Sequence, residues 1–232
     1  MTRIRVILLA GLCVGLAPLA AQEKSVKPGI NDPFKDPDVK EFQGKFEVES
    51  REVYAKRTAI LKHCMLKPGM AVADVGAGTG LFTRLFAAEV GNKGKVYAVD
   101  IAKNFLNYID KTAKKQKLAN VETVLCTATS TELKPNSVDL VYVCDTYHHF
   151  EFPSRTLASI HKALKPGGQL IVIDFERIPG KSREWILGHV RAGQELVEKE
   201  ITQAGFKKTG EVKDLLAENY FVRFEKVEGG SK

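Results

Sequence analysis

The sequence predicts a single α/β domain, a doubly wound and mostly parallel sheet of seven strands whose last strand is antiparallel. Three observations predict this fold class. From residue 71 onward, short and continuously apolar runs alternate with helical stretches, as is typical of parallel strands covered on both faces. A glycine-rich turn at residues 74–80 follows the first of these runs. Near the C-terminus, two strand-like runs are joined by a connection too short for a crossover helix, so they should pair antiparallel.

The elements follow one another in a regular order. The expected strands are short apolar runs at residues 71–75, 95–99, 121–126, 138–144, 169–174, 206–212 and 220–227. The expected helices each carry one apolar face and span residues 45–66, 81–90, 104–118, 154–164 and 195–204. Proline and glycine punctuate the pattern, since Lys67-Pro68-Gly69 stops the first helix and Lys165-Pro166-Gly167-Gly168 turns the chain into the fifth strand.

Composition indicates a soluble globular protein, with 44% hydrophobic and 27% charged residues. The net charge of +7 comes from lysines scattered along the chain. The densest group is Lys111, Lys114, Lys115 and Lys117. No aromatic residues interleave with these lysines, as a base-stacking surface would need. The group is therefore interpreted as a solvated helix face, and we expect no nucleic-acid partner.

The first residues have the layout of a secretory signal peptide. Arg3 and Arg5 are followed by an apolar run over residues 6–16 and by small residues up to Ala21. We expect residues 1–21 to be removed, leaving an exported protein, periplasmic or secreted, with no stable membrane span. The alternatives are an uncleaved signal that anchors the chain in the membrane, or a mis-assigned start and a cytoplasmic protein.

The rest of the chain divides into three parts. Residues 22–44 contain three prolines without periodicity and are expected to form an extended arm. Residues 45–228 form the folded domain, and residues 229–232 a frayed tail. The mature cysteines Cys64, Cys126 and Cys144 lack metal-binding spacing and are interpreted as small buried hydrophobes. Cys126 and Cys144 should be separated by two strands, beyond disulfide reach.

The turn from Asp74 to Gly80 distinguishes two classes of ligand. A dinucleotide site spaces its glycines G-x-G-x-x-G, so that pyrophosphate meets a helix N-terminus. Here the third glycine comes one residue early, and Asp74 stands two residues before the first, Gly76. This carboxylate would oppose a pyrophosphate but suits a positively charged ligand. The spacing therefore disfavours an NAD-dependent oxidoreductase.

The turn resembles the first motif of class I S-adenosylmethionine (SAM) methyltransferases, and the resemblance extends over residues 47–227. It implies SAM as cofactor, held around its methionine part by Asp74, Gly76, Ala77, Gly78 and Gly80. Asp100 and Ile101 follow the second strand, where a carboxylate can accept hydrogen bonds from the ribose hydroxyls. Asp100 could equally serve as a helix N-cap, and the two roles are compatible.

The ends of the third and fourth strands carry the remaining cofactor positions. Related methyltransferases commonly have an aspartate near Thr127 or Ala128 to bind adenine, but this chain has none there, so hydroxyl or backbone groups would have to read the base. Asp145 opens the segment Asp145-Thr146-Tyr147-His148-His149-Phe150. The segment resembles the fourth-strand motif of the group that includes ubiquinone and menaquinone C-methyltransferases, where a double histidine is frequent.

This resemblance implies that Tyr147, His148 and His149 are the catalytic candidates, with one histidine as general base. The alternative is that they close the pocket structurally. Because two adjacent histidines are a poor metal pair without further ligands, we expect no metal site. The segment after the fifth strand, with Trp185, His189 and Arg191, should cover the acceptor pocket. Arg191 would bind an anionic acceptor there or be a surface charge.

The sequence thus predicts SAM-dependent methyl transfer to a small-molecule or lipid-like acceptor. The alternative is a non-catalytic protein that binds SAM, S-adenosylhomocysteine or another nucleoside and keeps the fold. The signal peptide motivates this alternative, because SAM is made in the cytoplasm. The acceptor and the oligomeric state are left open.

Overall fold

The computed structural model describes residues 24–228. The expected signal peptide and the tail at 229–232 lie outside the described residues. Seven strands form one sheet in the order β3-β2-β1-β4-β5-β7-β6. Their bounds are β1 Ala71–Val75, β2 Lys95–Asp100, β3 Val121–Leu125, β4 Val138–Cys144, β5 Leu164–Phe175, β6 Phe206–Glu211 and β7 Asn219–Lys226. Strands β1 to β5 pair in parallel, while β7 runs antiparallel to both β5 and β6, which confirms the predicted sheet.

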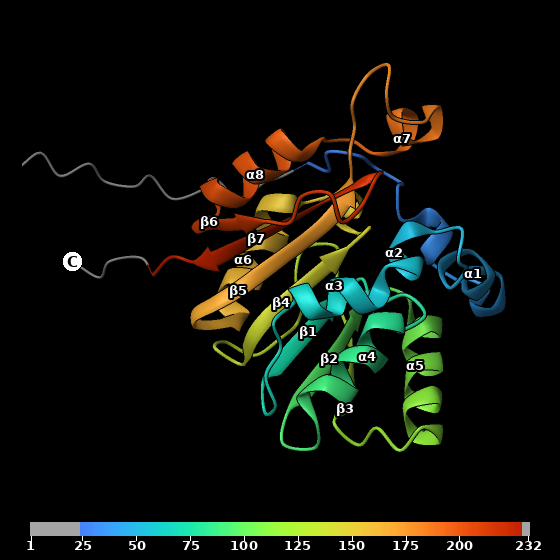
Figure 1. Ribbon diagram of the computed structural model, residues 1–232, viewed down its shortest axis with the longest axis vertical. Helices are drawn as coiled ribbons and strands as arrows, with labels where there is room; N and C mark the ends of the chain where they lie inside the picture. Colours follow the sequence, from blue (N-terminus) through green and yellow to red (C-terminus); the bar gives the residue numbers. More distant parts are fainter. Residues whose placement is uncertain (1–23, 229–232) are drawn as a thin grey trace, which may run out of the picture.

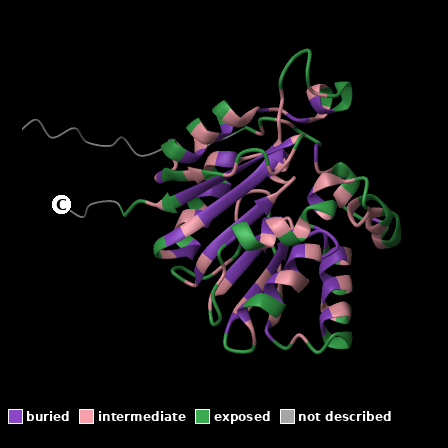
Figure 2. Cartoon of the chain, in the orientation of Figure 1, coloured by how far each residue is buried: buried purple, intermediate pink, exposed green. Residues whose placement is uncertain are grey.

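Helices cover both faces of the sheet (Figure 1). The helices α3 (Arg57–His63), α4 (Leu81–Val90) and α5 (Lys103–Lys115) lie on one face. The helices α6 (Pro153–Ala163) and α8 (Gln194–Gln203) lie on the other. The central strands are therefore buried on both sides (Figure 2), which explains why their sequences are continuously apolar rather than alternating.

The N-terminal part differs from the expected extended arm and single long helix. The short 3₁₀ helix η1 (Asp32–Phe34) lies within residues 22–44, and the helix α1 (Val39–Phe46) crosses the expected end of this arm. Asp38 begins α1, because its carboxylate accepts hydrogen bonds from the backbone N–H groups of Lys40 and Glu41. The expected helix at 45–66 is broken into the end of α1, the short α2 (Glu52–Ala55), and α3.

All five parallel strands end at the same edge of the sheet, where β1 and β4 lie side by side although they are not consecutive. In open α/β sheets a ligand binds at such a point. Four segments gather beyond this edge: η1, α1, the 3₁₀ helix η2 (Tyr147–His149) and the helix α7 (Glu184–His189). Among the described residues, no helix is long and apolar enough to cross a membrane.

Candidate active site

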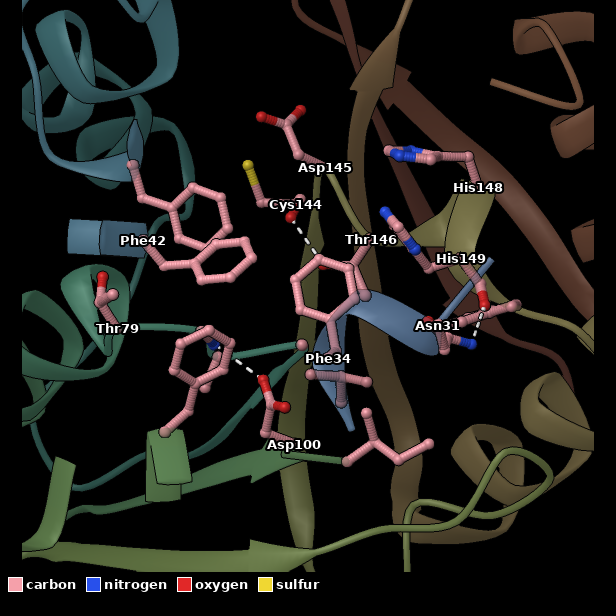
Figure 3. A pocket seen from close by; sticks show the side chains of 18 of the residues that line it. Asn31, Phe34, Phe42, Thr79, Asp100, Cys144, Asp145, Thr146, His148 and His149 are labelled. Carbon is pink, nitrogen blue, oxygen red and sulfur yellow. Dashed lines mark hydrogen bonds between the residues drawn. The ribbon is translucent and has the colours of Figure 1, made fainter. Parts of the chain in front are cut away.

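A cavity of about 710 Å³ lies at this edge of the sheet (Figure 3). Its walls come from the turn after β1, the ends of β2, β3 and β4, the N-terminal segment and α7. The sequence-predicted residues that line it are Asp74, Gly76, Ala77, Gly78, Asp100, Ile101, Thr127, Ala128, Asp145, His148 and His149. Gly80 and Tyr147 are not among its lining residues. The fold therefore brings together nearly all of the predicted site.

The three glycines of the turn differ in what surrounds them, although all have positive φ angles of 75°, 53° and 76°. A Cβ atom on Gly76 would lie 2.2 Å from the Thr146 side chain, and one on Gly80 would lie 2.7 Å from Ile109. A Cβ atom on Gly78 would lie 3.2 Å from the ring of Phe46, a side chain from α1. Gly76 and Gly80 are thus required by internal packing, and Gly80 begins α4 rather than contacting the cavity.

Asp100 ties the glycine turn to the end of β2. Its side chain is buried, and its two oxygens accept hydrogen bonds from the N–H groups of Gly78 and Ala102, each at 2.8 Å. Burial raises the pKa of Asp100 to about 6, although these backbone donors lower it. Each carboxylate oxygen keeps a second lone pair, so the group can also accept a bond from a ligand hydroxyl. Asp100 is not the N-cap of α5 (Lys103–Lys115), since that position is held by Ala102 without a side-chain bond, but its bond to the Ala102 N–H fixes the start of the helix and leaves room for a ligand.

Asp74, at the end of β1, is also buried in the cavity wall. Its Oδ2 accepts a hydrogen bond of 2.6 Å from the Thr83 hydroxyl of α4. Burial raises the pKa of Asp74 to about 7, despite the opposing effect of Thr83, and the nearby charge of Asp100 raises it further. The carboxyl group is thus only partly ionised near neutral pH, which weakens its expected attraction for a cationic ligand.

Asp145 joins three distant parts of the chain. Arg51, from the start of α2, donates to its Oδ2 at 2.5 Å, and the Asn219 amide at the start of β7 donates to its Oδ1 at 2.5 Å. Burial raises the pKa of Asp145, although the Arg51 charge opposes this effect. Asp145 has a φ angle of 48°, so its backbone is strained into the left-handed region. This ion pair fixes the N-terminal helices against the end of β4.

The loop after β3 contributes small and hydroxyl-bearing groups. Among the described residues, those from this loop that line the cavity are Cys126, Thr127, Ala128, Ser130 and Thr131, without a carboxylate. Thr127 forms an isolated backbone bridge with Ser130, which holds the loop closed. Adenine recognition by hydroxyl and backbone groups stays a prediction.

Tyr147 is a correction to the predicted catalytic set. Its side chain is fully buried away from the cavity, and its hydroxyl donates to Glu200 of α8 at 2.8 Å. Arg191 donates two hydrogen bonds to the same carboxylate, at 2.9 and 2.7 Å. Arg191 therefore holds α8 and does not reach an anionic acceptor. Tyr147 and Arg191 thus form a structural cluster with Glu200 that joins η2 to α8.

The two histidines of η2 line the cavity beside each other (Figure 3). His148 Nδ1 lies 2.7 Å from Asp174 Oδ1, and the His148 backbone N–H donates to Asp174 Oδ2. Burial favours protonated Asp174, but the charge of His148 and its hydrogen bond outweigh this effect and lower the pKa of Asp174. Burial and the neighbouring imidazoles lower the pKa of His149 to about 3, so His149 is neutral and a weak base. The His148–Asp174 pair is the better candidate for a general base.

Several lining residues were not anticipated from the sequence. Phe34, Phe42 and Phe46 of the N-terminal segment pack around Phe105, with ring centroids 5.5 Å apart for Phe42 and Phe105. The spacing of Phe42 and Phe46, four residues apart, is the signal that could have shown a helix with an aromatic face. The Asn31 amide donates to the backbone carbonyl of His149, so η1 is attached to η2 (Figure 3).

Two of the cysteines also depart from expectation. Cys64 is buried as predicted, but Cys126 and Cys144 are only partly buried and line the cavity. Burial raises the pKa of Cys126 to about 12 and raises that of Cys144 well above its ordinary value. Both thiols are therefore protonated, and neither is a ready nucleophile.

The sheet order, the acidic glycine turn and the buried carboxylate after β2 define a class I SAM-dependent methyltransferase. The comparisons with known proteins agree. Residues 66–220 match the family model described as "Methyltransferase domain". The chain belongs to this methyltransferase family, and its cofactor is SAM.

The similar proteins share the fold and part of the sequence. A SAM-dependent methyltransferase from Aquifex aeolicus is 26% identical with a TM-score of 0.72, covering 83% of this chain and 100% of that one. The ubiquinone/menaquinone biosynthesis C-methyltransferase UbiE of Hydrogenovibrio crunogenus is 31% identical over 49% of this chain and 45% of its own length. The same protein of Vibrio cholerae is 32% identical over 48% and 43%. The chain thus spans less than half the length of these curated relatives.

The cavity residues fit a nucleoside cofactor. Asp100 offers buried acceptor oxygens beside the glycine turn, and Gly78 leaves room limited only by the side chain of Phe46. In this site Asp100 would hold the ribose, and the turn would lie along the methionine part. The His148 end of the cavity would then be left for an acceptor.

Proposed function

We propose that this protein transfers a methyl group from SAM to a small-molecule or lipid-like acceptor, and that it does so as an exported enzyme, periplasmic or secreted. The observation that carries the acceptor class is the shape of the cavity. It extends without interruption from the glycine turn and Asp100 to the aromatic side chains of Phe175 and Trp185. A cavity of about 710 Å³ lies well within the range of about 300–1,000 Å³ for small-ligand sites.

The chain's own residues would mainly position and shield the reactants. Bound SAM supplies a methyl group that is already activated on a sulfonium. Phe34, Phe42 and Phe150 line the cavity with apolar rings that would exclude water from the bound reactants. His148, oriented by Asp174, would take a proton from an acceptor that must lose one.

The aromatic end of the cavity favours an apolar acceptor. Phe175 and Trp185 pack edge to face with ring centroids 5.0 Å apart, and Trp185 is 44% exposed at the mouth. The relatives named for ubiquinone and menaquinone biosynthesis are consistent with such an acceptor. Because the chain spans under half of their length, the acceptor class is supported chiefly by the cavity itself.

Trp185→Ala is expected to raise the KM for the acceptor about tenfold, as for the loss of about 1.4 kcal/mol of apolar contact. The dissociation constant for S-adenosylhomocysteine should not change, because Trp185 lies at the other end of the cavity. The measurement is transfer of a labelled methyl group from SAM to organic-soluble molecules of an envelope extract. Absence of any labelled product from extracts of envelope or cytoplasm would refute methyl transfer to a small acceptor.

Export is expected to give a mature protein that begins just after Ala21 and separates with the periplasmic or secreted fraction. This expectation is supported by residues 3–21, in which two arginines are followed by an apolar run and then by small residues. The measurement is N-terminal sequencing of the native protein from each cell fraction, with a cytoplasmic enzyme as leakage control. A full-length chain found in the cytoplasm would overturn export, while one in the membrane would indicate an anchor.

A further inference from the structure

Three of the five histidines in the chain meet at one point of the cavity. His148 and His149 come from η2, and His189 ends α7, 40 residues after His149. One nitrogen of each imidazole lies within 4.8 Å of the others, and the Nε2 atoms of His149 and His189 are 3.4 Å apart. The sequence argument against a metal site depended on two histidines without a further ligand, and the structure supplies the third.

The spacing suits coordination of one ion. Zinc–nitrogen bonds of about 2.0–2.1 Å in tetrahedral geometry place two ligand nitrogens about 3.3 Å apart. The separation of 3.4 Å between His149 and His189 matches this value. The remaining separations are at most 4.8 Å, and His189 belongs to a short, partly exposed helix, so we expect side-chain rotation on ion binding to close them.

His148 is held as a metal-bound histidine usually is. Its Nδ1 contacts the buried carboxylate of Asp174 at 2.7 Å, which leaves Nε2 as the free ligand atom. Metal-ligating imidazoles commonly donate their other nitrogen to a carboxylate in this way. Asp174 also accepts from the His148 backbone, so both the ring and the main chain of His148 are fixed.

The other two histidines are also positioned by their main chains. Asn31 donates to the carbonyl of His149, and the Lys27 ammonium donates to the carbonyls of Gly188 and His189. The Nδ1 atom of His149 is buried without a hydrogen-bond partner among the described residues. The Lys27 charge opposes a cation nearby, and the Asp174 carboxylate offsets it.

We propose that His148, His149 and His189 bind one divalent transition-metal ion, with Zn²⁺ the best fit, and that Asp174 orients His148 from behind. The protein provides three nitrogen ligands, which leaves the fourth position of a tetrahedral ion open to the cavity. An ion there would bind a hydroxyl, thiol or carbonyl group of the acceptor and lower the pKa of a bound hydroxyl. Because Nε2 of His148 is then a metal ligand, the ion would take the place of His148 in activating the acceptor. This role in the reaction rests on the proposed methyl transfer, whereas the metal site itself does not.

The test is Co²⁺ and Zn²⁺ binding to purified protein that carries no polyhistidine tag and has been stripped with a chelator. We expect one ion per chain by elemental analysis, and visible ligand-field bands with Co²⁺ that Zn²⁺ removes. His189→Ala and His149→Ala should each weaken binding by more than about 100-fold, and Asp174→Asn by about 10–100-fold. His63→Ala and His161→Ala are matched controls, because these two histidines lie outside the cavity, and both should bind as the wild type does.

Calorimetry with S-adenosylhomocysteine keeps the two proposals separate and reports folding of each variant. A variant that binds this ligand normally is folded, so its loss of Co²⁺ binding supports the metal site. Wild-type protein that binds S-adenosylhomocysteine but takes up no stoichiometric metal would overturn the metal site alone. Metal binding that survives in His189→Ala, or that falls equally in His63→Ala, would also overturn it and leave a metal-free histidine cluster. Metal binding without nucleoside binding would instead contradict the proposed function.

Discussion

Asp100→Ala is expected to weaken binding of SAM and S-adenosylhomocysteine by more than about 100-fold, which corresponds to about 2.8 kcal/mol. The carboxylate accepts from two buried backbone N–H groups, those of Gly78 and Ala102. Its loss removes the acceptor for the ribose hydroxyls and releases the N–H of Gly78, so the glycine turn is no longer held in place for the ligand. Isothermal titration calorimetry of the purified domain measures the effect.

Asp110→Ala is the matched control for this variant. Asp110 lies on α5 close in sequence to Asp100, but its side chain is 47% exposed and pairs with Lys114 at 2.6 Å. Its removal should leave cofactor affinity unchanged. Equal affinity of Asp100→Ala and wild type would refute the assignment of Asp100 to the cofactor.

The pH dependence of wild-type binding gives a second check. Burial sets the pKa of Asp100 at about 6 in the unliganded protein, above the ordinary value of 3.8. A ligand that hydrogen bonds to the ionised Asp100 carboxylate is therefore bound more weakly as the pH falls below about 6. Asp74, whose pKa is about 7, adds a separate fall in affinity for a cationic ligand that begins at higher pH. Asp100→Asn should lose the fall near pH 6 and keep the fall near pH 7 that belongs to Asp74.

Arg51→Ala is expected to lower the free energy of unfolding by about 3 kcal/mol, because it leaves Asp145 as a buried charge without its partner. The Arg51 and Asp145 side chains are 25% and 9% exposed, so water compensates for the loss only in part. For a chain of this size the midpoint temperature should fall by about 6–12 °C. Thermal unfolding followed by circular dichroism measures the change.

The double variant Arg51→Ala/Asp145→Asn tests the cause. Replacing the carboxylate by a neutral amide removes the unpaired charge, so the double variant should be more stable than Arg51→Ala alone. Asp145→Asn also keeps an oxygen that can accept from Asn219. Additive losses from the two single variants would show that Arg51 and Asp145 do not stabilise each other.

The sheet and the cofactor end of the site could be predicted from the sequence because both depend on local patterns. The strands at Ala71–Val75 and Val138–Cys144 have the bounds that their apolar runs indicate. Since parallel strands end at one edge, the residues after each strand were expected to meet, and Asp100 and Asp145 do line one cavity.

The acceptor end could not be predicted in the same way, because it depends on contacts between distant segments. His189 reaches His149 across 40 residues, and no local pattern specifies that contact. Tyr147 was assigned to the site by its place beside His148. In a 3₁₀ helix, successive side chains point about 120° apart, so the neighbours of one inward residue can face the core. Tyr147 does so and joins α8 through Glu200.

Two of the three glycines in the turn are required by packing, so their presence alone does not indicate that a related protein still binds a nucleoside. Thr146 and Ile109 each occupy the space that a side chain at Gly76 or Gly80 would need. A descendant of this chain that stopped binding a nucleoside would still be under selection to keep these two glycines, since replacing either would disrupt the fold. Gly78 faces a movable phenyl ring, so its φ angle of 53° is the main restriction there, and a residue that tolerates the left-handed region could enter once the ligand is lost. Among divergent copies, substitution at the middle glycine is therefore the more informative mark of an abandoned activity.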